Sequence, residues 1–327
     1  MTWMLSQADA THLPLADRSV DLVFGSPPYC DARTYGIGAQ RDCMAWVEWM
    51  LTVTAEAQRV ARGPVLWVAA GVTRDRNYWP ACEGLMWEWW KRGGDCQLYR
   101  PCYWHRVGIP GSGGKDWFRA DVEYVMCFKR PGRLPWADNT AMGHPPKWGP
   151  GGEMSNRLRD GERINQWGRI SKSGRGRRAN MEHKTGGSPS HRIIVVDQRK
   201  ARQSIASTYY SEPVKANPGN LIRTNVGGGQ MGHPLAHENE APFPEALAEW
   251  FIRSLCPPGG IVLDPFSGSG TTVAVAHRLD RHGIGFDLRL SQCELGRKRL
   301  LNPHHRRTRP AQPRVGQHEL FAATSGR

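Results

Sequence analysis

Apolar runs alternate with amphipathic stretches over the first 130 residues of the chain. Residues 20–25 and 64–70 are short, mostly apolar runs, which predict buried strands. Residues 83–92 predict a helix, and residues 121–128 predict a further strand that ends before a Lys-Arg-Pro-Gly turn. Between the first two runs, apolar residues recur at steps of three and four, as on one face of a helix: Trp46, Met50, Val53, Ala57 and Val60.

The same alternation returns in the C-terminal part of the chain. A helix is predicted from Phe243, because Pro244 and Glu245 favour a first turn, and it ends before Pro257. The segments that follow predict a strand, a helix, a strand and a helix, at 261–264, 271–280, 283–287 and 291–301. Strands that alternate with helices are typical of an α/β fold with a mostly parallel sheet.

The middle of the chain has a different composition. Residues 131–230 are rich in Gly, Pro, Arg and Ser, with one short apolar run at 193–196 that predicts a strand. One interpretation is a solvated or disordered linker. The other is a functional lobe, because a structureless stretch of that length is uncommon inside a compact protein.

Charge narrows the choice of partner. The chain carries 44 Lys and Arg against 30 Asp and Glu, a net charge of +14, and residues 147–202 alone hold 14 basic and five acidic residues. Such an excess points to a polyanion. A membrane is disfavoured, because no run of 18 apolar residues occurs and the first residues lack a basic and an apolar segment. The eight cysteines form no CxxC pair, so we expect reduced thiols in a cytoplasmic protein, with no metal site.

A glycine-rich turn, DPFSGSGTT at 264–272, follows the predicted strand 261–264. Gly268 and Gly270 let the backbone approach a ligand, and the helix start offers free N–H groups. Asp287 ends the next strand, where such folds place the carboxylate that receives ribose hydroxyls. The turn predicts a nucleotide-binding unit, but no Lys-Ser or Lys-Thr pair makes it a P-loop, and its spacing is not GxGxxG.

A second turn, SPPY at 26–29, follows the predicted strand 20–25. Its two prolines stiffen the backbone and remove two N–H donors. The Ser26 hydroxyl and the Pro27 carbonyl remain as acceptors, with the Tyr29 ring beside them. This array suits a planar ligand with an exocyclic amine, such as a nucleobase; the alternative is an ordinary β-turn with a packed tyrosine.

Together the two turns resemble the motifs of the DNA amino-methyltransferases, which move a methyl group from S-adenosylmethionine to cytosine N4 or adenine N6. DPFSGSGTT resembles the cofactor loop of that family, and SPPY resembles its catalytic motif. Weaker similarities lie at 7–15, at 122–128 and at 232–245. The catalytic motif comes before the variable region and the cofactor loop, an order that resembles the circularly permuted beta class.

The resemblance implies a Rossmann-like methyltransferase fold that is circularly permuted and carries an inserted basic target-recognition region. The expected parts are a catalytic half at 1–130, the insert at 131–230, a cofactor-binding half at 231–301 and a basic tail at 302–327.

Residue roles follow from the same resemblance. Asp264 is expected to face the methionyl ammonium, Asp287 the ribose and Asp9 the adenine amine. The expected catalytic residues are Ser26, Pro27, Pro28 and Tyr29. The residues expected to bind S-adenosylmethionine are Asp9, Asp264, Phe266, Gly268, Gly270, Thr271 and Asp287. The residues expected to contact DNA are Arg157, Arg169, Lys172, Arg175, Arg177 and Arg178.

The function favoured by the sequence is methylation of cytosine N4 in duplex DNA, with the target base flipped out of the helix. A motif that begins with Ser most often accompanies cytosine in this family, but adenine N6 stays open. So does a nucleic-acid-binding protein on an inactive methyltransferase scaffold. The expected host is bacterial or a phage, and a restriction endonuclease is a candidate partner; the oligomeric state is open.

Overall fold

The structure is a computed structural model that describes residues 2–31, 42–108, 118–145, 215–226 and 231–302. Its contacts divide the chain into one unit of Met1–Gly143 with Asn217–Arg327, and a second of His144–Ala216. Almost all of the second unit lies outside the described residues, and so does the predicted strand at 193–196. Both ends of the predicted insert 131–230, residues 131–143 and 217–230, belong to the first unit.

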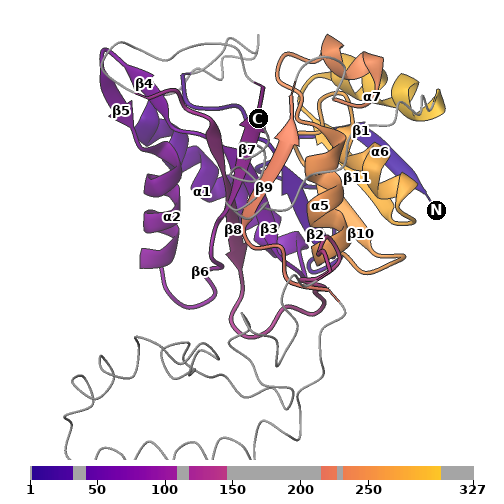
Figure 1. Cartoon of the computed structure of the whole chain (residues 1–327), viewed down its shortest axis with the longest axis horizontal. Helices are drawn as coiled ribbons and strands as arrows, with labels where there is room; N and C mark the ends of the chain where they lie inside the picture. The colour runs from indigo at the N-terminus through magenta and orange to yellow at the C-terminus, as the bar shows by residue number, and fades with distance from the viewer. Residues whose placement is uncertain (1, 32–41, 109–117, 146–214, 227–230, 303–327) are drawn as a thin grey trace, which may run out of the picture. The chain divides into compact units, whose positions relative to one another are not determined.

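The first unit is built on one mixed sheet, in which the described residues form nine strands (Figure 1). The sheet order is β1-β11-β10-β2-β3-β8-β7-β9, with β6 also paired to β8. Neighbours from β1 to β3 run parallel, β8 is antiparallel to β3, β6 and β7, and β7 is parallel to β9. The strand bounds are β1 Trp3–Gln7, β2 Leu22–Gly25, β3 Val65–Ala69, β6 Gln97–Leu98, β7 Cys102–Val107, β8 Val122–Lys129, β9 Leu221–Asn225, β10 Ile261–Asp264 and β11 His282–Asp287.

Helices cover both faces of this sheet (Figure 1). One face carries α1 (Cys43–Val60) and α2 (Ala81–Lys91), and the other carries α5 (Glu245–Leu255), α6 (Thr271–Arg278) and α7 (Leu290–Leu301). A short hairpin of β4 (Val72–Arg74) and β5 (Asn77–Trp79) follows β3, and the 3-10 helix η2 (Pro234–Glu238) precedes α5. The α/β prediction is confirmed, and each helix expected from apolar spacing is present within a few residues of its expected bounds.

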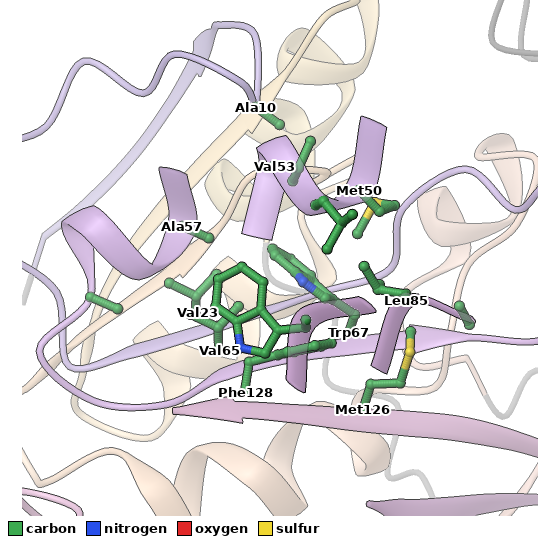
Figure 2. Packing of buried hydrophobic residues seen from close by; sticks show 14 of the residues in the cluster. Ala10, Val23, Met50, Val53, Ala57, Val65, Trp67, Leu85, Met126 and Phe128 are labelled. Carbon is green, nitrogen blue, oxygen red and sulfur yellow. The ribbon is translucent and has the colours of Figure 1, made fainter. Parts of the chain in front are cut away.

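The core has two layers because the sheet is buried on both faces. On β2, Val23 packs against α1 in the cluster that Figure 2 shows, together with Val65 and Trp67 from β3. The next residue, Phe24, faces the other layer, where its ring lies 5.3 Å from Phe251 and 5.5 Å from Phe243. A strand that is buried on both faces has no polar alternation, which is why β2 appears in the sequence as a continuous apolar run.

The direction in which the chain winds reverses between β2 and β10. From β2 the chain passes through α1 to β3 on one side, and from β10 it passes through α6 to β11 on the other. Because β2 and β10 are neighbours, the loops that leave their carboxyl ends diverge and open a crevice. In open α/β sheets, ligands bind at this topological switch point.

We expect Phe24→Ala to destabilise the first unit by about 3–5 kcal/mol, because it leaves a cavity beside two aromatic rings. Met44→Ala, at a position of α1 that is 66% exposed, is the matched control and should change stability by less than about 0.5 kcal/mol. Urea unfolding of the full chain followed by circular dichroism measures both. Equal losses in the two variants would show that Phe24 is not part of the core.

Candidate active site

A cavity lies at the switch point, at the carboxyl edge of the sheet. The ends of four neighbouring parallel strands, β1, β11, β10 and β2, supply most of its wall, and the segment before α5 and Trp49 of α1 supply the rest. The lining residues are Asp9, Ala10, Ser26, Pro27, Pro28, Trp49, Asn239, Ala241, Pro242, Phe243, Pro265, Phe266, Ser267, Gly268, Thr271, Asp287, Leu288 and Arg289. Both motifs predicted from the sequence therefore open into one cavity.

The Ser-Pro-Pro turn presents hydrogen-bond acceptors to this cavity. The Ser26 hydroxyl donates its proton to the Val68 carbonyl at 3.0 Å, so its lone pairs remain for a ligand. The Pro27 carbonyl accepts no hydrogen bond from the residues that the structure describes. The Trp46 indole donates to the Pro28 carbonyl at 2.7 Å and holds the end of the turn against α1. The Ser26 hydroxyl and the Pro27 carbonyl thus form an acceptor pair that the turn holds in a fixed position.

Tyr29 lies outside the set of lining residues and has a partner of its own. Its hydroxyl donates to the Glu123 carboxylate on β8 at 2.5 Å, and Glu123 forms an ion pair with Arg106 on β7 at 2.7 Å. Burial, and then the charge of Glu123, raise the pKa of the Tyr29 phenol well above its ordinary value, so the hydroxyl stays protonated. The sequence placed Tyr29 in the site but gave no indication of this partner.

The glycine-rich turn requires both of its glycines, for different reasons. Gly268 and Gly270 have φ of +47° and +76°, in the left-handed region. A Cβ on Gly268 would also lie 2.7 Å from the side-chain amide nitrogen of Asn239, another residue that lines the cavity. Gly270 is the N-cap of α6 and packs against Gly296 of α7, so it shapes the turn without lining the cavity.

Aromatic rings form one wall of the cavity. Phe266 meets Trp49 and Trp67 edge to face, at centroid distances of 5.8 and 5.7 Å. Trp49 comes from α1 and Trp67 from β3, so the ring of Phe266 is held from the side of the sheet that carries α1. Such a wall suits the flat face of an aromatic ligand.

Two carboxylates, those of Asp9 and Asp287, also line the cavity. Asp287 accepts backbone N–H bonds from Gly268 at 3.0 Å and from Arg289 at 2.9 Å, one on each oxygen. A carboxylate has about four lone-pair sites, so Asp287 can accept two further bonds from a ligand. Asp9, at the exposed rim after β1, uses one oxygen for the N–H of Thr11 at 2.9 Å.

Asp264 is turned away from the cavity, although the sequence placed it beside the ligand. It is 1% exposed, and its two oxygens accept bonds from the Thr272 hydroxyl at 2.6 Å and from the Phe266 N–H at 3.0 Å. Burial raises the pKa of this carboxyl to about 7. The structure therefore shows Asp264 as a support of the glycine-rich turn.

A buried ion pair holds the same turn from behind. Arg299 of α7, only 2% exposed, donates to the Thr271 hydroxyl at 2.8 Å and to Glu245 of α5 at 2.6 Å. Glu245 also contacts Arg278. Thr271 is thus both a lining residue and a link between α6 and α7. The sequence gave Glu245 only the role of starting a helix.

The lining residues that the sequence analysis did not anticipate include Trp49, Asn239 and Arg289. Trp49 sits on α1 beside the predicted apolar face, and Arg289 follows Asp287 by two positions, so both were near recognised features. The six basic residues predicted to contact DNA lie outside the described residues. None of the helices in the described part of the chain is long and apolar enough to cross a membrane.

The fold and the cavity together define a doubly wound α/β protein with a nucleotide-type site at its switch point and an acceptor pair beside it. The chain belongs to the DNA methylase family, whose model matches residues 20–298. This confirms the family resemblance that the two motifs indicated.

Curated relatives match over short segments. The chain is 43% identical over 87 residues to the orphan methyltransferase M.BamHII of Bacillus amyloliquefaciens, which is 25% of this chain and 33% of that protein. It is 41% identical over 68 residues to the type II methyltransferase M.SmaI of Serratia marcescens, which is 21% of this chain and 23% of that protein. The matches thus span a third or less of these relatives.

Solved structures match over most of the chain. The PvuII DNA methyltransferase, described as cytosine-N4-specific, aligns with a TM-score of 0.60 and 16% identity, over 94% of this chain and 89% of that one. A DNA modification methylase of Thermus thermophilus, TTHA0409, solved with S-adenosyl-L-methionine, aligns with a TM-score of 0.50 and 20% identity, over 91% of this chain and 93% of that one. At these identities the matches confirm the fold class.

The raised pKa of Asp264 predicts a pH dependence of stability. Its folded pKa of about 7 exceeds the ordinary value of 3.8, so between these two pH values the folded protein keeps a proton that the unfolded chain releases. The free energy of unfolding should therefore fall as pH rises through that window, by at most about 1.4 kcal/mol per pH unit, and level off above it. The isosteric variant Asp264→Asn should lack this component.

Urea unfolding of the wild type and Asp264→Asn at a series of pH values measures the effect, because the other titrating groups cancel in the difference between the two proteins. Parallel curves from pH 4 to pH 8 would contradict the assignment.

Proposed function

We propose that this protein transfers a methyl group from S-adenosylmethionine to the exocyclic N4 of cytosine in duplex DNA. The observation that carries the proposal is the common cavity of the two turns. The acceptor pair after β2 and the glycine-rich turn after β10 open into one space, although their sequences are about 240 residues apart. An amine bound at the first turn would lie next to a ligand bound at the second.

The cavity fits the cofactor by its chemistry. S-adenosylmethionine supplies an electrophilic methyl group when it is bound. Phe266 and Trp49 offer an aromatic wall for its adenine, and Asp287 offers free lone pairs for ribose hydroxyls. Gly268 leaves open the space that a Cβ would fill. Asp9 at the rim is a further acceptor for the adenine amine, while Asp264 would act through the turn that it supports.

The acceptor pair explains how the amine could be activated. The lone pair of an exocyclic amine is delocalised into the base and is a poor nucleophile. The Ser26 hydroxyl and the Pro27 carbonyl would each accept one N–H bond, which favours a pyramidal nitrogen whose lone pair points into the cavity. Acceleration would come from positioning and from electrostatics in a dry site, without a covalent intermediate.

Base flipping belongs to this proposal, since a base inside a duplex cannot reach a cavity of this kind. Tyr29 would stack on the flipped base. The basic stretch 147–202 would contact DNA phosphates, and its many arginines suit guanine readout. A circularly permuted order of parts, with residues 131–230 as the insert, is likewise part of the proposal. A restriction partner is also part of it.

Adenine N6 is the second candidate. The DNA methylase family whose model matches the chain includes both N6 and N4 methyltransferases, so membership alone does not choose the base. Two observations favour cytosine: the first residue of the catalytic motif is Ser26, and the PvuII enzyme is cytosine-N4-specific.

The product decides the matter. Plasmid DNA from a methylation-deficient host, incubated with the purified full chain and S-adenosylmethionine, should yield N4-methylcytosine in nucleoside mass spectrometry. N6-methyladenine as the sole product would overturn the choice of base and leave the methyltransferase assignment intact. No modified nucleoside in DNA, with the cofactor still bound, would support the inactive-scaffold alternative.

Two variants separate the two halves of the cavity. Ser26→Ala removes an acceptor from the base side and should lower the turnover number about ten- to a hundredfold with little change in cofactor affinity. Asp287→Ala should instead weaken cofactor binding about ten- to a hundredfold, through the loss of charge-assisted hydrogen bonds. Calorimetric titration with S-adenosylmethionine and single-turnover methylation assays measure the two quantities. Identical defects in both variants would argue against this division.

A further inference from the structure

The Tyr29 hydroxyl is held by a chain of charged side chains that the proposed chemistry does not explain. Tyr29 donates to Glu123, and Glu123 is paired with Arg106. Glu123 is only 5% exposed, and it sits in a strand, β8, whose other residues as far as Phe128 are apolar or aromatic. A buried carboxylate is costly unless it is paired, so this one calls for a physical reason.

The position of Glu123 is fixed by the sheet. It lies directly opposite Trp104 on β7, and the Trp104 indole donates to Thr224 on β9 at 2.7 Å. Arg106 is two residues further along β7 and therefore shares the face of Trp104. Arg106 of β7 thus pairs with one oxygen of the carboxylate, Oε1, while the other, Oε2, accepts the bond from the Tyr29 hydroxyl.

We infer that Glu123 is a positioning residue for the proposed methyl transfer: it fixes the plane of the Tyr29 ring, against which the flipped base would stack, and Arg106 fixes Glu123. The inference rests on the proposed function. A phenol ring without a partner at its hydroxyl turns about two side-chain bonds, whereas a hydrogen bond to a charged acceptor in a rigid strand restricts both. A fixed ring lowers the entropy cost of holding the base in line.

The hydroxyl is suited to this task over the whole working range of pH. Because burial and Glu123 raise its pKa, it remains a donor when the solution is neutral or basic. Among the described residues, the charged group that contacts the pair is Arg106, which neutralises Glu123, whereas the carboxylate of nearby Asp121 is paired with Arg119. Phenylalanine at position 29 would keep the stacking surface and lose the hydroxyl, which interacts with Glu123 and also with the Ser26 side chain.

The chain contains a matched control. Tyr124 follows Glu123 in β8, and its side chain packs against the core on the α1 face. The Tyr124 hydroxyl donates to the Glu83 carboxylate at 3.2 Å. Tyr124→Phe removes a phenol–carboxylate bond of the same kind, but one made to Glu83 instead of Glu123, from a side chain that does not line the cavity. It should leave methylation unchanged.

The experiment compares the full-length wild type, Tyr29→Phe, Glu123→Gln, the double variant and Tyr124→Phe. Turnover number and KM for DNA come from transfer of a tritiated methyl group, and cofactor affinity comes from calorimetry. We expect Tyr29→Phe and Glu123→Gln each to lower the turnover number about tenfold with unchanged cofactor affinity. The double variant should be no worse than about the poorer single one, since both changes act on the same hydrogen bond: Tyr29→Phe removes it, and Glu123→Gln takes the charge from its acceptor.

Three results would overturn the inference while leaving methyl transfer itself established: wild-type turnover in Tyr29→Phe, multiplied losses in the double variant, or an equal loss in Tyr124→Phe. A wild type that transfers no methyl group would instead overturn the proposed function. In that case NMR of ring-labelled tyrosine still tests the hydrogen bond between Tyr29 and Glu123. Glu123→Gln should speed the flipping of the Tyr29 ring and leave the flipping of the Tyr124 ring unchanged. Equal Tyr29 flip rates in both proteins would contradict it.

Discussion

The parallel pairing of β2 with β10 is the contact on which the site depends. It joins Leu22 to Val262 and Val23 to Leu263, residues that are far apart in the sequence. Asp21 reinforces the junction, because its carboxylate accepts the N–H of Ile261 at 2.8 Å and pairs with Arg62 at 2.6 Å. Without this pairing the Ser-Pro-Pro turn and the glycine-rich turn would lie on separate pieces of sheet, and neither would have a cavity.

Buried polar groups stabilise the edge of the sheet that this pairing creates. Arg299 with Glu245, Asp264 with Thr272 and Tyr29 with Glu123 each lie behind a turn rather than in the cavity. Each pair satisfies groups that would otherwise be costly to bury. The common result is rigidity: the loops at the switch point are held from the protein side, so their free lone pairs keep fixed directions.

Much of this could be predicted from the sequence, because buried strands and amphipathic helices have distinct periodicities. Strands β2, β3, β8, β10 and β11 were predicted, and so were the helices. Strand β1 was missed because only Leu5 on it is buried, which leaves no periodic signal. Strands β7 and β9 were missed because polar residues such as Arg106 and Thr224 interrupt them, and the partners of those residues lie on other strands.

The motifs of the site could be predicted from the sequence, but the orientation of their side chains and the contacts between them could not. Ser26, Asp287 and the glycine-rich turn were found because their spacing after strands is local information. The orientation of Asp264 was not, since the partner that turns it inward is a hydroxyl in the following helix. Glu123 was visible as a charge within an apolar strand, but its contact with Tyr29 spans 94 positions, and no local pattern encodes such a distance.

The place of α7 has a consequence for how this chain could be cut and rejoined. Helix α7 leaves the carboxyl end of β11 and packs along β1, where Arg297 donates to the Leu5 carbonyl at 2.6 Å. Its twelve residues span about 18 Å, close to the length of the strand it runs beside. It therefore ends near the level at which β1 begins, and β1 is already the parallel neighbour of β11. A short linker from α7 to β1 would complete one more β-α-β crossover, so the sheet could be made from a gene that starts at α5 and ends after β9.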